Sequence, residues 1–273
     1  MHLSLRSRLP ILVIGFLVIL TSVPLSGIAS ASAVPAVLVG RENGTVSSVN
    51  WSGYAVTASA GSVTDAQGSW IVPAVTCGSK QTSYSAFWVG IDGYSSTTVE
   101  QTGTDSDCSR GTPHYYAWYE FYPKASKDIG SFPVHPGDVV TASVTYSGGI
   151  FTVTIQDITS GKTFTTTGTV SSAQRSSAEF IVEAPETCIL IKCKLSSLSN
   201  FGTASLGTDY TNVGGMNCGV AENGGPVAAL GSYGSNVQEI AMVSQANHSV
   251  VKAQPSVLSA DGTSFTVQWL KAS

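Results

Sequence analysis

The stretch Ala178-Glu179-Phe180-Ile181-Val182-Glu183-Ala184 alternates in the manner of a β-strand. Side chains two residues apart point to the same side of a strand, so Phe180 and Val182 face one way while Glu179 and Glu183 face the other. Charged residues make up only 11% of the chain. Two carboxylates on one face of a strand are unusual in such a chain, and they predict either a solvated surface or a groove that holds acids.

The same period of two recurs from Asn50 onward in short segments separated by Gly, Ser, Asp and Pro. The clearest hairpin joins residues 139–147 to residues 151–157 across Gly148-Gly149. Only residues 171–176 allow a helical turn. We expect strands at Trp51–Thr57, Gly68–Val72, Ser85–Ile91, Thr97–Thr102, His114–Tyr122, Val139–Ser147, Phe151–Asp157, Thr163–Thr167, Ala178–Ala184, Thr208–Val213, Val237–Val243 and Thr263–Leu270. Short strands without intervening helices predict an all-β fold, an antiparallel sandwich or barrel, in a single domain over residues 50–273.

The N-terminus has the organisation of a secretory signal peptide. Arg6 and Arg8 precede an apolar run over residues 11–20, and the small residues that follow end in Ala31-Ser32-Ala33. We expect residues 1–33 to be a signal peptide cleaved after Ala33, residues 34–49 to be a short leader or flexible N-terminus, and the protein to be secreted. A membrane anchor is the alternative, but the run is short for a span and a cleavage site follows it.

The charge of the chain argues against some classes of partner. Without residues 1–33 it has 11 basic and 17 acidic residues, a formal net charge of −6. A lysine-poor, acidic surface does not suit nucleic acid, which is bound through Lys and Arg at phosphates. It does suit an acidic medium, where protonation of carboxylates brings the net charge towards zero. We expect no nucleic-acid and no membrane partner.

Five cysteines in an exported chain predict disulfides. Cys188 and Cys193 flank a four-residue loop and are natural partners, and Cys77 with Cys108 would tie two loops around the strand that holds Trp88. Cys218 is then left over. Metal binding is the competing interpretation, but the chain has no C-x₂-C pair and its histidines are scattered. We expect neither a metal nor a cofactor.

The strand predicted at residues 114–122 combines aromatic side chains with an acid. Tyr116, Trp118, Glu120 and Tyr122 share one face. A carboxylate cannot lie in a dry core without a partner, so this face is predicted to line a groove for an extended polymer, either peptide or sugar. The alternative to a groove is an exposed aromatic stripe that stabilises cross-strand pairs.

The common hydrolase motifs are absent from the sequence. It contains neither a G-x-S-x-G elbow nor an H-E-x-x-H helix, and its many serines make any Ser/His/Asp set unspecific. A paired-carboxylate plan remains, with Glu100, Glu120, Glu179 and Glu183 on predicted strands.

Seven motifs, in this order over nearly the whole chain after residue 49, resemble those of the glutamic peptidases, or eqolisins. They are Asn50-Trp51-Ser52-Gly53-Tyr54, Gly68-Ser69-Trp70-Ile71-Val72-Pro73, Phe87-Trp88-Val89-Gly90-Ile91-Asp92-Gly93, Glu100-Gln101-Thr102-Gly103, Trp118-Tyr119-Glu120-Phe121-Tyr122-Pro123, Ala178-Glu179-Phe180-Ile181-Val182-Glu183 and Asn200-Phe201-Gly202. The ordered set is far more specific than any single motif.

The resemblance implies a sandwich of two seven-stranded antiparallel sheets with an open groove, and endopeptidase activity on polypeptides in acid. It also implies a catalytic pair in which Glu179 is the general base and Gln101 stabilises the oxyanion, with Glu183 in a supporting role. Further positions that match the family around the groove are Trp88, Asp92, Asp105, Trp118, Glu120 and Tyr122. Members of the family from fungi carry a long propeptide, whereas only about sixteen residues separate the predicted signal peptide from the first motif here, so activation by propeptide removal is not expected.

Two other functions fit the same groove. A carbohydrate-binding or glycoside-hydrolysing sandwich also uses aromatics and paired acids, and it would act on or bind polysaccharide. A catalytically silent adhesion domain would cleave no peptide at any pH. In each case we expect a monomer.

Overall fold

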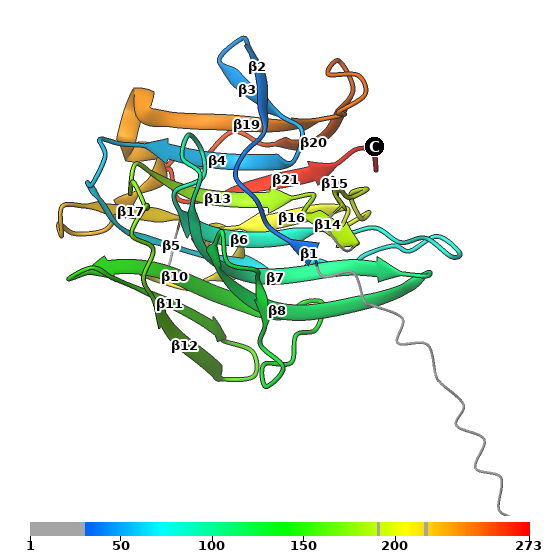
Figure 1. The fold of residues 1–273 in the computed structure, drawn as a ribbon, viewed down its shortest axis with the longest axis horizontal. Coiled ribbons are helices and arrows are strands. Elements are labelled where there is room, and N and C mark those ends of the chain that lie inside the picture. Colours follow the sequence, from blue (N-terminus) through cyan, green and yellow to red (C-terminus); the bar gives the residue numbers. More distant parts are fainter. Residues whose placement is uncertain (1–30, 190–191, 216–217) are drawn as a thin grey trace, which may run out of the picture.

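The computed structural model describes residues 31–189, 192–215 and 218–273. Two antiparallel β-sheets are stacked face to face, which confirms the predicted all-β sandwich (Figure 1). The predicted signal peptide lies outside the described residues except for its last three. In the described part of the chain, no helix is long and apolar enough to cross a membrane.

The first sheet carries the predicted site. Its strands, in spatial order, are β9 (Lys127–Asp128), β8 (Thr112–Tyr122), β7 (Val99–Ser109), β6 (Ala86–Ile91), β13 (Ser177–Glu183), β4 (Trp51–Thr57) and β19 (Val237–Val243). The strand that holds Glu179 and Glu183, β13, is therefore a central strand with neighbours on both sides.

The second sheet packs behind the first. Its strands, in spatial order, are β12 (Lys162–Gly168), β11 (Ile150–Asp157), β10 (Val139–Ser147), β5 (Val63–Ile71), β16 (Thr203–Leu206), β21 (Phe265–Trp269) and β20 (Val251–Pro255). The two sheets are joined at one edge because β20 also pairs with β19.

The remaining elements are short and lie around these sheets. They are β1 (Ala31–Ser32), β2 (Leu38–Glu42), β3 (Thr45–Ser48), β14 (Glu186–Ile189), β15 (Lys192–Leu195), β17 (Gly219–Glu222), β18 (Ala228–Ala229), the helix α1 (Thr208–Thr211) and the 3₁₀ segment η1 (Leu230–Asn236).

Strand alternation divides the apolar side chains into two clusters. The larger one fills the space between the sheets and includes Phe180 and Val182 of β13. The smaller one lies on the opposite side of the first sheet, which we call the outer face, and includes Trp88, Trp118 and Ile181. Because both faces of β13 are covered, all seven of its residues are buried.

Several predicted elements differ from the observed ones. Strands β4, β10 and β19 have the predicted bounds, whereas β7 continues far beyond its predicted end at Thr102. Gly103 follows that predicted end and lies inside β7. A Cβ there would be 2.3 Å from the carbonyl oxygen of Phe87, so close backbone approach from β6 is what requires glycine.

Three further expectations about local structure were wrong. The strand predicted at residues 208–213 is the short helix α1, because the backbone turns at Gly207 (φ 97°) and the helix ends at Asn212 in the left-handed conformation. Residues 171–176 form no helix. The segment 34–49, which has no clear sequence pattern, contains β2 and β3, and β3 pairs in parallel with β19.

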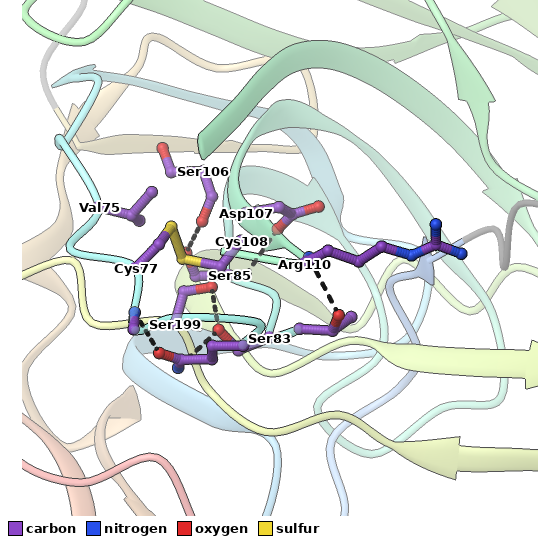
Figure 2. Close-up of a disulfide and its surroundings, with 12 residues drawn as sticks. Val75, Cys77, Ser83, Ser85, Ser106, Asp107, Cys108, Arg110 and Ser199 are labelled. Atoms are coloured by element: carbon purple, nitrogen blue, oxygen red, sulfur yellow. Dashed lines mark hydrogen bonds between the residues drawn. A yellow bond between two sulfur atoms is a disulfide. The ribbon is translucent and has the colours of Figure 1, made fainter. Parts of the chain in front are cut away.

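Both predicted disulfides are present. Cys77 and Cys108 join the loop before β6 to β7, and Cys188 and Cys193 join β14 to β15. Figure 2 shows the first of these beside Ser83, whose hydroxyl lies 3.0 Å from that of Ser199. Cys218 is buried and is not in a disulfide.

Candidate active site

Strand register brings the predicted catalytic residues into one row on the outer face. Glu120 of β8 lies opposite Gln101 of β7, Gln101 lies opposite Gly90 of β6, and Gly90 lies opposite Glu179 of β13. Paired residues in an antiparallel sheet point to the same side. The Trp88 ring lies over Gly90, since a Cβ on that glycine would be 3.1 Å from the ring. The predicted pair is thus in one row, on strands separated by β6.

Glu179, the predicted general base, is completely buried. Among the described residues, no hydrogen bond reaches either of its carboxylate oxygens. Burial raises its pKa well above the ordinary value, and the charges of Asp92 and Glu100 raise it further, while the nearby polar groups of Ser177 and the Tyr94 backbone lower it. Because no donor reaches its carboxylate, hydrogen bonds among the described residues do not stabilise the ionised form of Glu179.

Glu183 is also completely buried but has three hydrogen-bond donors. Its Oε2 accepts from the Trp88 indole nitrogen at 2.9 Å, and its Oε1 accepts from the Val34 backbone nitrogen at 3.0 Å and from Asn50 Nδ2 at 3.4 Å. Burial raises the pKa of this carboxyl well above its ordinary value, while these hydrogen bonds oppose that shift. A carboxylate held by three donors has a defined orientation.

Gln101 is buried between two acceptors. Its Nε2 donates to Glu120 Oε2 at 2.9 Å and lies 3.4 Å from the carbonyl oxygen of Ala33. Burial raises the pKa of Glu120 to about 8, although hydrogen bonds from Ser32 and Gln101 lower it. Gln101 is therefore held with its amide nitrogen directed at the N-terminal segment.

That N-terminal segment, residues 31–37, crosses the outer face in extended form (Figure 1). On one side, β1 pairs with β14, and the Ser32 hydroxyl donates to Glu120 Oε1 at 2.6 Å. On the other side, the carbonyl of Val34 accepts from the Trp51 indole at 3.0 Å, and the Val37 amide donates to Asn50 Oδ1 at 2.8 Å. Ala33 is 3% exposed and Val34 is 7% exposed, so the segment is packed into the site.

Asp92, at the end of β6, binds the loop that precedes β13. Its carboxylate accepts hydrogen bonds from the backbone nitrogens of Gln174, Arg175 and Ser176 at 2.7, 2.7 and 2.9 Å. These bonds tie the loop before β13 to the end of β6. Asp92 was predicted to lie around the groove, and we conclude that it positions β13. Among the described residues, it makes no hydrogen bond to residues 31–37.

Asp105 is held by two aromatic side chains on the same face. It accepts from the Trp118 indole at 2.5 Å and from the Tyr116 hydroxyl at 2.9 Å. Burial raises its pKa to about 7. With Ala31 and Ala33, these residues line a cavity of about 10 Å³, too small for a side chain. Tyr122, the last predicted aromatic, packs at the edge of the same cluster.

Two parts of this site were not predicted. Asn50 and Trp51 contact the N-terminal segment, although sequence reasoning gave them no role. Their position in the first of the seven motifs was the available signal. The segment itself was expected to be a signal-peptide end followed by a leader, and no residue pattern indicates that it covers the outer face.

The buried carboxyls predict a fold that is more stable in acid than at neutral pH. Burial raises the pKa of Glu100 from an ordinary value of 4.5 to about 9, that of Glu120 to about 8 and that of Asp105 to about 7. Between pH 4.5 and 8 the native state therefore binds more protons than the unfolded state, and stability falls as pH rises. We expect Tm to drop by about 10 °C across this window in calorimetry.

Glu100 provides the matched control for that experiment. Glu100→Gln keeps the shape of the side chain and removes one titration, so its Tm should vary less with pH than that of the wild type. A Tm that rises from pH 4.5 to 8, or an equally steep fall in the variant, would contradict the explanation.

Comparison with known proteins points to one family. A model described as the Peptidase A4 family matches residues 49–253. The chain is 34% identical to scytalidopepsin B of Scytalidium lignicola over 166 residues, which are 59% of this chain and 60% of that protein. It is 30% identical to aspergillopepsin-2 of Aspergillus niger over 206 residues, which are 66% of this chain and 71% of that protein. The first match thus spans less than two thirds of its relative.

Solved structures agree at the level of the fold. A crystal structure of scytalido-glutamic peptidase with a transition state analog inhibitor superposes with a TM-score of 0.67 at 24% identity, covering 81% of this chain and 98% of that one. The crystal structure of aspergilloglutamic peptidase from Aspergillus niger gives a TM-score of 0.55 at 26% identity, with coverage of 68% and 99%.

Proposed function

Because this chain belongs to the peptidase A4 family of glutamic peptidases, we propose that it is a secreted acid endopeptidase in which Glu183 and Gln101 act on the scissile peptide bond. The family is the one that the seven sequence motifs indicated. The proposal keeps Gln101 from the sequence analysis and replaces Glu179 by Glu183.

One observation carries the assignment. The two groups contact the two ends of one peptide unit, since Gln101 Nε2 lies 3.4 Å from the Ala33 carbonyl oxygen and Glu183 Oε1 lies 3.0 Å from the Val34 nitrogen. A peptidase needs a donor at the carbonyl oxygen, where charge develops, and an acid at the nitrogen that leaves. Glu179 makes neither contact.

The chemistry follows from these two positions. With a substrate bond in place of Ala33–Val34, ionised Glu183 takes a proton from a water molecule that attacks the carbonyl carbon. The Gln101 amide does not titrate, and it donates to the oxyanion of the tetrahedral intermediate. Glu183 then returns the proton to the nitrogen as the C–N bond breaks, which leaves a carboxylate and an amine.

Two features support action outside the cell and in acid. Disulfides persist in oxidising compartments, and the chain has two of them. The buried carboxyls Glu100, Glu120 and Asp105 favour the folded state where they are protonated, which is below neutral pH. The folded state of a peptidase with these buried carboxyls is most stable in an acidic medium.

The direct test is hydrolysis of a denatured protein by the purified protein from pH 2 to pH 8. We expect cleavage at internal peptide bonds, with an optimum below pH 6. Mass spectrometry of the released peptides measures it. A silent adhesion domain would release no peptides at any pH, and that outcome would refute the proposal.

A further inference from the structure

Lys252, in β20, is a lysine that the fold buries almost completely. It is 4% exposed. An ammonium has three donor hydrogens, but among the described residues this one makes a single hydrogen bond, to the carbonyl oxygen of Val49 at 3.4 Å. The one ion pair in the described part of the chain joins His135 to Asp138, so no carboxylate oxygen there lies within 4.0 Å of Lys252 Nζ. Buried lysines are ordinarily paired with an anion, because burying an unpaired charge is costly.

Lys252 lines a cavity of about 210 Å³ where β20 meets the loops that precede β4 and follow β15 and β19. Two buried serines, Ser196 and Ser244, line it as well. The Ser196 hydroxyl has no hydrogen-bond partner among the residues that the structure describes. Ser197 and Gln245 belong to the lining and are exposed, so the cavity is open to solvent. No Asp or Glu of the described chain lines it.

These groups match the chemistry of an anion. The ammonium supplies a positive charge and further donor hydrogens, and serine hydroxyls can donate to the oxygens of a ligand. A lysine acts as a point charge and does not demand the planar geometry that an arginine does. We propose that this cavity binds a small oxyanion, either a carboxylate or a phosphate- or sulfate-type group, with Lys252 as its counter-ion and the hydroxyls of Ser196 and Ser244 as donors.

The charge of Lys252 makes the binding useful to the fold. Burial lowers the pKa of its ammonium from 10.5 to about 8, so the group is charged throughout the acidic range. Below pH 8 the native state therefore holds a charge that burial disfavours, and a bound anion offsets this cost. The unfolded chain does not assemble the cavity. A ligand that binds only the native state raises stability by mass action.

The cavity is separate from the proposed active site, although one peptide unit links them. The Val49 carbonyl accepts from Lys252, and the next residue, Asn50, reaches Glu183 Oε1 at 3.4 Å through its amide nitrogen. Neither Gln101 nor Glu183 lines the cavity. The inference therefore does not rest on the proposed function, and it can be tested without any measurement of hydrolysis.

The test measures Tm of the full chain at pH 6 by circular dichroism, with increasing phosphate, sulfate or acetate and with sodium chloride keeping the ionic strength constant. We expect at least one of these oxyanions to give a saturable rise of about 3–6 °C. Isothermal titration calorimetry should find one site per chain. The anion with the lowest Kd distinguishes the sources, because acetate represents carboxylates while phosphate and sulfate represent tetrahedral oxyanions.

Variants of two lysines locate the site. Lys252→Met keeps an unbranched side chain without the charge and should lose the rise in Tm. Lys271→Met is the matched control, because Lys271 is exposed and does not line the cavity, and it should keep the rise. Ser196→Ala leaves the lysine in place and should raise Kd about tenfold, the effect of a lost hydrogen bond to a charged group. It carries the test if Lys252→Met does not fold.

Three results would overturn the proposal. A rise of the same size in wild type and Lys252→Met would mean that the anions act on the whole surface. A wild type that responds to no oxyanion beyond the chloride control has no such site. An unchanged Kd in Ser196→Ala would contradict the role of its hydroxyl as a donor. None of these results bears on peptide hydrolysis, so a failure here is distinct from a failure of the proposed function.

Discussion

Glu183→Gln is expected to lower kcat/KM for a denatured protein by about 10²–10⁴-fold, the contribution typical of a positioned general acid–base. The glutamine side chain has the same shape and can still accept from the Trp88 indole, so the fold should persist. It cannot take a proton from water. The measurement is steady-state hydrolysis at the pH optimum, with Tm recorded for each protein.

Glu179→Gln is the comparison that decides between the two acids of β13. Both carboxyls are buried on the same face, and only Glu183 contacts the Ala33–Val34 unit. We expect Glu179→Gln to retain activity near that of the wild type. Loss of activity in Glu179→Gln together with full activity in Glu183→Gln would return the role of base to Glu179.

Gln101→Ala is expected to reduce kcat by about 10²–10³-fold with little change in KM, because an oxyanion donor acts mainly in the transition state. The variant removes the amide that lies 3.4 Å from the Ala33 carbonyl oxygen. A pH–rate profile adds a second test. The optimum should keep its position, since an amide does not titrate.

Gln238 offers a control of the same residue type on the same face. It lies in β19 opposite Ala55, which is itself opposite Glu179, and its amide donates to the Ser235 carbonyl. Gln238→Ala should leave kcat close to the wild-type value. An equal loss in both variants would mean that Gln101 matters for folding or packing, and circular dichroism would then report a lowered Tm.

Most of the strand pattern followed from the residues because it depends on local alternation. β4, β10 and β19 were predicted with their observed bounds, and the two disulfide pairings were also correct. Errors occurred where a neighbour decides the backbone. β7 continues through Gly103, where the close approach of β6 requires glycine, and that contact is not visible in the sequence around it.

Glu179 and Glu183 show the same difference between what local alternation determines and what neighbouring segments determine. The period of two by itself put Glu179 and Glu183 on one face of a strand, opposite Phe180 and Val182, and it made both candidates. Their tertiary surroundings differ, because Glu179 lies beside Asp92 and Glu100 while Glu183 accepts hydrogen bonds from Trp88 and Val34. The contact with Val34 joins residues 149 positions apart. Alternation is a property of one strand, whereas a site is a property of the segments that meet there.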